Sequence, residues 1–249
     1  MSKAGRKKKE RLDVLLVEKG LVQSREKAQA LIMEGRVAVN GAVETKSGKA
    51  VSVESSVTVR EGPRFVGRGG LKLSGVLDEL DISVGGLTVL DIGSSTGGFT
   101  DCLLKRGAKK VFAVDVGKGL LDSSLRNDPR VTLLEGKNFR YMSPQEVGER
   151  VDLAVIDVSF ISLDKILPNL AKGFLKEGAL VLSLIKPQFE VGKGEVGKGG
   201  IVRDPEKHRR VIDKILDFSK EIGFKPLEVR QSRVTGAKGN KEFWALLSY

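Results

Sequence analysis

Residues 87–101 read LTVLDIGSSTGGFTD, and this stretch decides the fold. Four of its first six residues are apolar, which is typical of a strand buried on both faces of a sheet. Gly93, Gly97 and Gly98 let the backbone turn tightly and approach a ligand closely. A helix is expected from about Phe99. The stretch therefore predicts a strand, a ligand-binding turn and a helix in immediate succession.

The same alternation of apolar strand and helix continues towards the C-terminus. Helices are expected from about Leu120 and from about Leu163. The further predicted strands comprise residues 110–115, 131–134, 151–157 and 179–185. This order indicates an α/β domain with a Rossmann-like, mostly parallel sheet that is covered on both faces. Ligands of such sheets bind at the carboxyl ends of the strands, which here are the loops after Asp91, Asp115, Asp157 and Ile185.

A cofactor site is predicted where the first two of these strands end. Asp91 ends the first, and Asp115 ends the second and can accept hydrogen bonds from both hydroxyls of an adenosine ribose. The GxGxxG spacing that seats a pyrophosphate is absent, so the loop favours S-adenosylmethionine (SAM) over a dinucleotide. A structural glycine turn capped by an aspartate is the alternative. The candidate SAM-binding residues are Asp91, Gly93, Ser94, Ser95, Thr96, Gly97, Gly98, Phe99, Asp115, Val116, Asn138 and Asp157.

Residues 10–60 follow a second pattern, typical of a small α+β unit. Apolar residues recur at helical spacing from Leu12, and Ser24 is the expected N-cap of a second helix that ends near Gly35. Short strands are expected between residues 37 and 59. Asn40-Gly41 predicts a hairpin turn, because both central residues of that turn need positive φ.

The positive charge of the chain is concentrated in its first third. The 249 residues carry a net charge of +11, and residues 1–76 hold 16 Lys or Arg against 8 Asp or Glu. This asymmetry predicts a surface that docks on a polyanion such as nucleic acid. A solubilising tail is the alternative for the basic run at residues 6–9. Residues 61–75 are glycine-rich and basic, so we expect a connector in which Arg64 and Arg68 join the candidate RNA contacts.

The composition excludes several classes of protein. No apolar run approaches the roughly 20 residues that span a bilayer, and the basic N-terminus lacks the apolar core of a secretory signal. With a single cysteine, Cys102, and a single histidine, the chain has no internal disulfide and little provision for a metal site. We therefore expect a cytoplasmic, monomeric protein without a bound metal.

Two sequence features narrow the methyl acceptor of a SAM-dependent enzyme. The Asp/Asn-Pro-Pro-aromatic run that is usual in enzymes methylating exocyclic nitrogens is absent after the fourth strand. Cys102 lies on an expected helix, and we interpret it as a core residue rather than as a nucleophile for base-carbon methylation. A hydroxyl acceptor is then the leading option, with a lysine that takes the hydroxyl proton and a carboxylate that orients it. The candidates are Lys72, Asp157, Lys186 and Glu242, and surface salt bridges are the alternative interpretation.

Three blocks of the first unit resemble the S-four RNA-binding domain, named for a small-subunit ribosomal protein. They are Glu10-Arg-Leu-Asp-Val-Leu-Leu, Ser24-Arg-Glu-Lys-Ala-Gln-Ala-Leu-Ile and Gly35-Arg-Val-Ala-Val-Asn-Gly41. The resemblance implies contacts with RNA phosphates, which give affinity without reading sequence. It places them at Arg11, Ser24, Arg25, Lys27 and Arg36. Because aromatic stacking residues are absent from this unit, docking on structured RNA is favoured.

The chain from about residue 68 resembles the FtsJ-like ribose methyltransferases, and the full length is similar to the TlyA or haemolysin-A-like family of rRNA 2′-O-methyltransferases. The stretches that carry this are Arg68-Gly-Gly-Leu-Lys-Leu, residues 91–101, Ala113-Val-Asp-Val-Gly, Asp157-Val-Ser-Phe-Ile, Lys186-Pro-Gln-Phe-Glu and Gly239-Asn-Lys-Glu. The resemblance implies SAM as cofactor and ribosomal RNA or ribosomal subunits as partner. It also implies a catalytic tetrad with Lys186 as central base and Asp157 as its orienter, while Lys72 and Glu242 shape the ribose site.

The expected organisation is an S-four-type RNA-binding domain over residues 1–62, a basic linker with a lead-in helix over 63–80, and a methyltransferase domain over 81–249. The glycine-rich segment 192–203 is expected to be a lid or a disordered loop. An RNA base methyltransferase, a non-enzymatic RNA-binding protein and a haemolysin-type protein remain the alternative functions.

Overall fold

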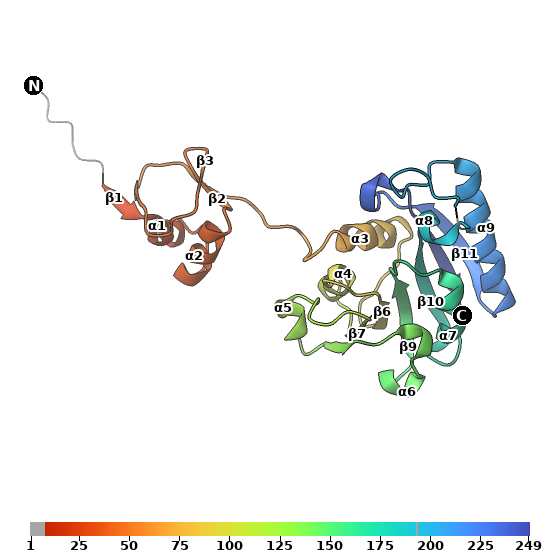
Figure 1. The fold of residues 1–249 in the computed structure, drawn as a ribbon. Helices are drawn as coiled ribbons and strands as arrows, with labels where there is room; N and C mark the ends of the chain where they lie inside the picture. Colours follow the sequence, from red (N-terminus) through yellow and green to blue (C-terminus); the bar gives the residue numbers. More distant parts are fainter. Residues whose placement is uncertain (1–7, 193) are drawn as a thin grey trace, which may run out of the picture. The chain divides into compact units, whose positions relative to one another are not determined.

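The computed structural model describes residues 8–192 and 194–249, and the chain divides between Arg64 and Phe65 into two compact units (Figure 1). The first two residues of the basic run, Arg6 and Lys7, lie outside the described residues. Residues 65–80, which make up most of the segment expected to be a linker with a lead-in helix, belong to the second unit.

The first unit combines two short helices with short antiparallel strands. Its elements are β1 (Lys9–Arg11), α1 (Leu12–Glu18), α2 (Arg25–Met33), β2 (Val37–Val39), β3 (Ala42–Glu44), β4 (Ala50–Ser52) and β5 (Val57–Val59). β2 pairs with β3 and β5, and β1 pairs with β4. Asn40 and Gly41 have φ values of 51° and 84°, which confirms the predicted hairpin turn. The Ser24 side chain accepts a hydrogen bond from Lys27 N and caps α2, as predicted.

The second unit is built on a seven-stranded sheet with the order β11-β12-β10-β9-β6-β7-β8. Its strands are β6 (Thr88–Ile92), β7 (Lys110–Asp115), β8 (Val131–Glu135), β9 (Val151–Ile156), β10 (Leu175–Ile185), β11 (Lys225–Gln231) and β12 (Phe243–Ser248). β12 runs antiparallel to both of its neighbours, and the other neighbouring pairs are parallel. The prediction of a mostly parallel sheet is confirmed. The strand order reverses between β6 and β9, which is where such sheets bind ligands.

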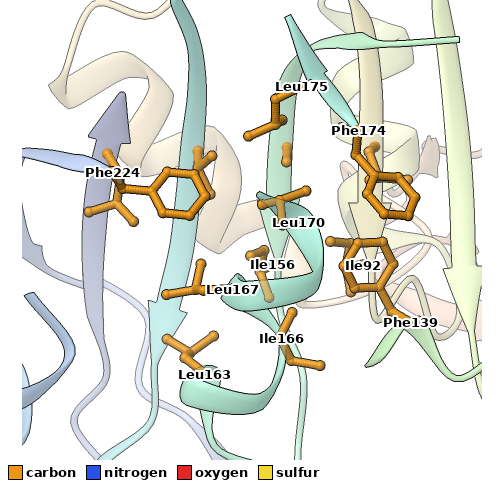
Figure 2. Packing of buried hydrophobic residues seen from close by; sticks show 14 of the residues in the cluster. Ile92, Phe139, Ile156, Leu163, Ile166, Leu167, Leu170, Phe174, Leu175 and Phe224 are labelled. Atoms are coloured by element: carbon orange, nitrogen blue, oxygen red, sulfur yellow. The ribbon is translucent and has the colours of Figure 1, made fainter. Parts of the chain in front are cut away.

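Helices cover both faces of this sheet. The α-helices and 3-10 helices (η) are α3 (Gly69–Glu79), α4 (Gly98–Lys105), α5 (Ser123–Arg126), η1 (Phe139–Tyr141), α6 (Pro144–Val147), η2 (Leu163–Lys165), α7 (Leu167–Leu170), α8 (Pro187–Glu190), α9 (Pro205–Glu221) and η3 (Ala237–Gly239). Apolar side chains of α3, α4 and α5 pack on one face. Those of η1, η2, α7 and α9 pack on the other, where Figure 2 shows Ile92 and Ile156 among Phe139, Leu163 and Leu167.

The helices differ from the sequence pattern in two respects. The helix expected from Leu163 is divided into η2 and α7. Pro168 explains the division, because proline lacks a backbone N–H and is tolerated only in the first turn of a helix. The sequence analysis did not identify α9, although its buried residues Val211 and Ile215 recur at helical spacing.

Candidate active site

A cavity of about 410 Å³ lies at the carboxyl ends of β6, β7 and β9, where the strand order reverses. Its volume lies in the range of small-molecule sites, which are mostly apolar with a few polar groups. The lining residues are Ile92, Gly93, Ser95, Val114, Asp115, Val116, Leu120, Lys137, Asn138, Phe139, Asp157, Val158, Ser159, Phe160, Ile161 and Ile166. The position and the mixed lining make this cavity the candidate cofactor site.

The turn after β6 requires glycine at position 93. Gly93 has a φ of +89°, and a Cβ atom there would lie 2.5 Å from the carbonyl oxygen of Asp157. The missing side chain therefore lets the ends of β6 and β9 approach each other. The turns after β6 and β7 together fix Asp115, because Ser95 N donates to one carboxylate oxygen at 2.8 Å and Gly117 N donates to the other at 2.7 Å. Each oxygen keeps a lone pair for a ligand.

Asp91 is fully buried at the end of β6, where Thr100 Oγ1 donates to its Oδ2 atom at 2.6 Å. In the part of the chain that the structure describes, its Oδ1 atom has no hydrogen-bond partner. Burial raises the pKa of this carboxyl to about 7; the Thr100 hydrogen bond opposes the rise, and the charge of Asp157 adds to it. A positive charge in the neighbouring cavity would therefore favour the ionised form of Asp91.

The predicted cofactor-binding residues divide between the cavity wall and the surrounding structure. The wall contains Gly93, Ser95, Asp115, Val116, Asn138 and Asp157. Outside the wall lie Asp91, Ser94, Thr96, Gly97, Gly98 and Phe99. The ring of Phe99 lies 5.7 Å from that of Trp244, and both are buried, so Phe99 contributes to the packing of α4 on the sheet.

Two lysine–carboxylate pairs lie at the same edge of the sheet. Lys186 Nζ lies 2.5 Å from Asp157 Oδ1 and donates a hydrogen bond to Ser159 Oγ at 2.9 Å. Lys72 Nζ, from α3, donates to Glu242 Oε2 at 2.7 Å. The side chains of Lys186 and Glu242 are 9% and 2% exposed, so the pairs are not the solvated surface salt bridges of the alternative interpretation.

The strand register explains why these residues lie together. β10 ends at Ile185, which pairs with Phe243 at the start of β12. Lys186 and Glu242 therefore follow and precede paired residues of adjacent strands. Strand β9 pairs with β10 on the side opposite β12, and Asp157 directly follows the last residue of β9. Of the four predicted catalytic residues, Asp157 lines the cavity and pairs with Lys186, and the register of β10 and β12 places the Lys72–Glu242 pair next to Lys186.

The sequence analysis did not identify an aromatic pair at the rim of the cavity. Phe160 is 91% exposed, lines the cavity and has a φ of +63°, a conformation that is unusual for phenylalanine. Its ring lies 4.9 Å from the ring of Phe189 in α8. Buried Glu190 accepts hydrogen bonds from Ser162 Oγ at 2.5 Å and from Leu163 N at 2.8 Å, which ties the loop after β9 to α8. These residues lie in or near the quoted motifs, but exposure and backbone conformation cannot be read from residue type.

In the first unit, part of the predicted RNA-binding charge is paired internally. Asp13 is buried and accepts hydrogen bonds from Arg11, Arg25 and Gln29. The Arg11 guanidinium, with smaller effects from Gln29 and Arg25, holds the pKa of this carboxyl well below its usual range despite its burial. The two arginine side chains remain 47% and 51% exposed, so the cluster presents fixed donors to solvent.

The other predicted RNA contacts have varied surroundings. Lys27, Arg64 and Arg68 are exposed. Arg36 donates two hydrogen bonds to the backbone oxygen of Arg60. Arg68 belongs to the second unit, whereas the other candidates belong to the first.

Comparison with known families decides the assignment of the second unit. The model of the FtsJ-like methyltransferases matches residues 65–249. The chain belongs to this family. The match covers the whole second unit, with its cavity and both lysine–carboxylate pairs, and confirms the resemblance inferred from the motifs. The model of the S4 domain matches residues 10–57, so an S4 domain precedes the FtsJ-like domain.

Relatives of this FtsJ-like protein are similar over nearly its whole length. The 16S/23S rRNA (cytidine-2′-O)-methyltransferase TlyA of Mycobacterium tuberculosis is 46% identical over 95% of this chain and 89% of TlyA. Hemolysin A of Brachyspira hyodysenteriae is 41% identical over 94% of this chain and 98% of the hemolysin A chain. The solved structure of a provisionally named hemolysin from Streptococcus thermophilus gives a TM-score of 0.73 at 43% identity, covering 98% of this chain and 89% of that one. Among the described residues of this chain, no helix is long and apolar enough to cross a membrane.

Proposed function

We propose that the protein transfers a methyl group from SAM to a ribose 2′-hydroxyl of ribosomal RNA. The observation that carries this proposal is the cluster of Lys72, Asp157, Lys186 and Glu242 beside the cavity. The named activity of TlyA, a relative over nearly the whole length, supports the same acceptor.

The residues around the cavity fit SAM. The two fixed oxygens of Asp115 suit the hydroxyls of an adenosine ribose. Val116, Leu120 and Asn138 provide an apolar surface and an amide for the adenine. Asp91 places a buried carboxyl near the cavity, with one oxygen to which none of the described residues donates, and this suits a cationic ligand. Bound SAM would supply an electrophilic methyl group on a positively charged sulfur atom.

The lysine–carboxylate cluster suits a hydroxyl acceptor. With SAM bound, the methyl group would pass from its sulfur to the 2′-oxygen, and Lys186 Nζ, in its amine form, would accept the proton that this oxygen loses. Asp157 and Ser159 stabilise the resulting ammonium through contacts like those in the structure, and the ammonium then returns the proton to solvent. Lys72 and Glu242 form a pair that is largely shielded from water and shapes the ribose side of the site.

Two further features fit an RNA acceptor. Exposed Phe160 offers an aromatic face at the cavity rim, on which an unstacked base can lie. In the S4 domain, Arg11, Arg25 and Lys27 expose positive charge that can bind phosphates. Phosphate contacts of this kind position an RNA without selecting its sequence.

The test is methyl transfer from labelled SAM to unmodified ribosomal RNA and ribosomal subunits, followed by digestion to nucleosides. We expect label in a 2′-O-methyl nucleoside and a loss of roughly 100-fold or more in Lys186→Ala. Lys176→Ala is the matched control, because Lys176 lies near the other end of β10 and also pairs with an aspartate, Asp152, at 2.6 Å. Label on a base would overturn the ribose acceptor, and SAM binding without transfer to either RNA preparation would overturn the substrate.

A further inference from the structure

A basic groove lies beside the start of β12, between residues 200–203 and residues 237–241. A cavity of about 340 Å³ there is lined by Ile201, Val202, Arg203, His208, Lys238, Gly239 and Lys241. An adjoining cavity of about 280 Å³ shares His208 and Lys241 and adds Arg209. None of the described residues that line the two cavities is acidic. The groove therefore concentrates positive charge without internal neutralisation.

The two walls of the groove are held together by Asn240. This side chain is buried, and its Nδ2 atom donates to Gly200 O at 2.9 Å and to Ala237 O at 3.1 Å. Its Oδ1 atom accepts from Val202 N at 3.1 Å. One side chain thus links both walls through backbone groups, so the groove is a built feature of the fold.

The cations of the groove are available to a ligand. Arg203, Lys238 and Lys241 are exposed, and none of them forms an ion pair within residues 8–192 and 194–249. By contrast, Arg210 on α9 pairs with Glu195 at 2.5 Å. The groove therefore holds charge that the described part of the chain does not pair with an acidic group.

The backbone around Lys238 adds an independent indication. Lys238 has a φ of 57°, a left-handed conformation that asparagine or glycine adopts more easily than lysine. Strained backbone of this kind concentrates at ligand-binding sites, where the surrounding structure enforces it. Here Asn240 Nδ2 donates to the backbone oxygen of Ala237, the residue before Lys238, and so closes the turn that contains it.

The groove adjoins the catalytic edge of the sheet. Lys241 directly precedes Glu242, which pairs with Lys72 of the catalytic cluster. We propose that the groove binds the phosphodiester backbone of the acceptor RNA next to the nucleotide that is methylated; this rests on the function proposed above. Lysine ammoniums and the guanidinium of Arg203 suit phosphate oxygens, since arginine can bind them in a bidentate manner. The contact positions the strand and carries no sequence information.

The test is steady-state methylation by full-length Lys238→Asn and Lys241→Ala over a series of potassium chloride concentrations. Asparagine tolerates positive φ, so Lys238→Asn removes the charge and keeps the turn. We expect KM for RNA to rise roughly threefold to tenfold and kcat to stay unchanged. The slope of log(kcat/KM) against log salt should become shallower by about 0.7 for each lost phosphate contact with single-stranded RNA. Lys225→Ala is the matched control, an exposed lysine at the opposite end of the neighbouring strand β11.

Variants that match Lys225→Ala in KM and salt slope would overturn the groove, and so would a fall in kcat at unchanged KM. If the wild-type protein transfers no methyl group to RNA, the proposed function fails. The groove is then judged separately by filter binding of the same proteins to unmodified ribosomal RNA transcripts. If both groove variants bind the RNA more weakly than the wild-type protein and Lys225→Ala does not, the groove is supported. Equal binding by all four proteins would refute the groove.

Discussion

Asp91 should make the stability of the ligand-free protein depend on pH. Its pKa rises from 3.8 to about 7 on folding because burial penalises the charged carboxyl more than the hydrogen bonds from Thr100 favour it. Below the unfolded pKa the group is neutral in both states, and its stabilising contribution is fully present. The contribution is lost as the pH rises from 3.8 towards 7, because the carboxyl ionises freely in the unfolded state while the buried one stays protonated. At about 1.4 kcal/mol for each unit of pKa, the total loss is about 4 kcal/mol.

The perturbation that tests this is Asp91→Asn, which removes the charge and keeps an acceptor for Thr100. Urea unfolding of both proteins at pH 5, 6, 7 and 8 gives the free energy of unfolding of each, and their difference cancels the other titrating groups. Between pH 5 and 7 the difference should shift in favour of the variant by about 1.4 kcal/mol for each pH unit, and then level off. A difference that is the same at every pH would refute the argument from burial.

The same carboxyl should couple SAM binding to pH. About one tenth of Asp91 is ionised one unit below its pKa, so the affinity for cationic SAM should weaken about tenfold between pH 8 and pH 6. In Asp91→Asn the affinity should be weaker and nearly independent of pH in this range. Isothermal titration calorimetry in two buffers with different ionisation enthalpies measures both the affinity and the protons released. No proton release by the wild-type protein at pH 6 would contradict the coupling.

Three further substitutions test the site. Gly93→Ala should lower the SAM affinity at least tenfold and reduce the melting temperature, because the added Cβ atom would lie 2.5 Å from Asp157 O. SAM binding at wild-type affinity, measured by calorimetry, would contradict this prediction. Glu190→Gln should leave the circular dichroism spectrum unchanged and lower kcat, because a neutral amide holds the loop after β9 less firmly than the carboxylate does. An unchanged kcat would show that the negative charge of Glu190 is dispensable. Phe160→Ala should raise KM for RNA roughly tenfold and leave the SAM affinity unchanged, and Phe160→Tyr should restore the wild-type KM. A loss of SAM affinity in Phe160→Ala would instead place Phe160 in the cofactor site.

Much of the fold could be predicted from local patterns. Apolar runs located β6, β7, β8 and β9 nearly to the residue, because a strand buried on both faces must be apolar along its length. The Asn40-Gly41 turn could be predicted because few residues accept positive φ. The charged three-residue strand β1 carries no such pattern, since an exposed edge strand is held by backbone hydrogen bonds that any residue can make.

The candidate site could be predicted only in part. The motifs pointed to Lys72, Asp157, Lys186 and Glu242, but periodicity and spacing did not show that the four residues lie together. The cavity wall contains only some of the glycine-rich turn, because Gly97 and Phe99 pack against neighbouring side chains. The groove around Lys238 and Asn240 was not predicted at all, since it depends on hydrogen bonds between the Asn240 side chain and backbone groups of a segment distant in sequence.

The sequence by itself determined the two domains, the order of the strands from β6 to β10, and the loops at which chemistry is possible, because these follow from patterns within short stretches of chain. Only the tertiary structure decided which side chains meet. Lys72 and Glu242 are 170 residues apart, and they pair because β12 inserts antiparallel beside β10 while α3 lies against the same sheet. The raised pKa of Asp91 and the exposure of Phe160 likewise depend on what surrounds each group, since desolvation and packing are properties of the folded neighbourhood rather than of the residue.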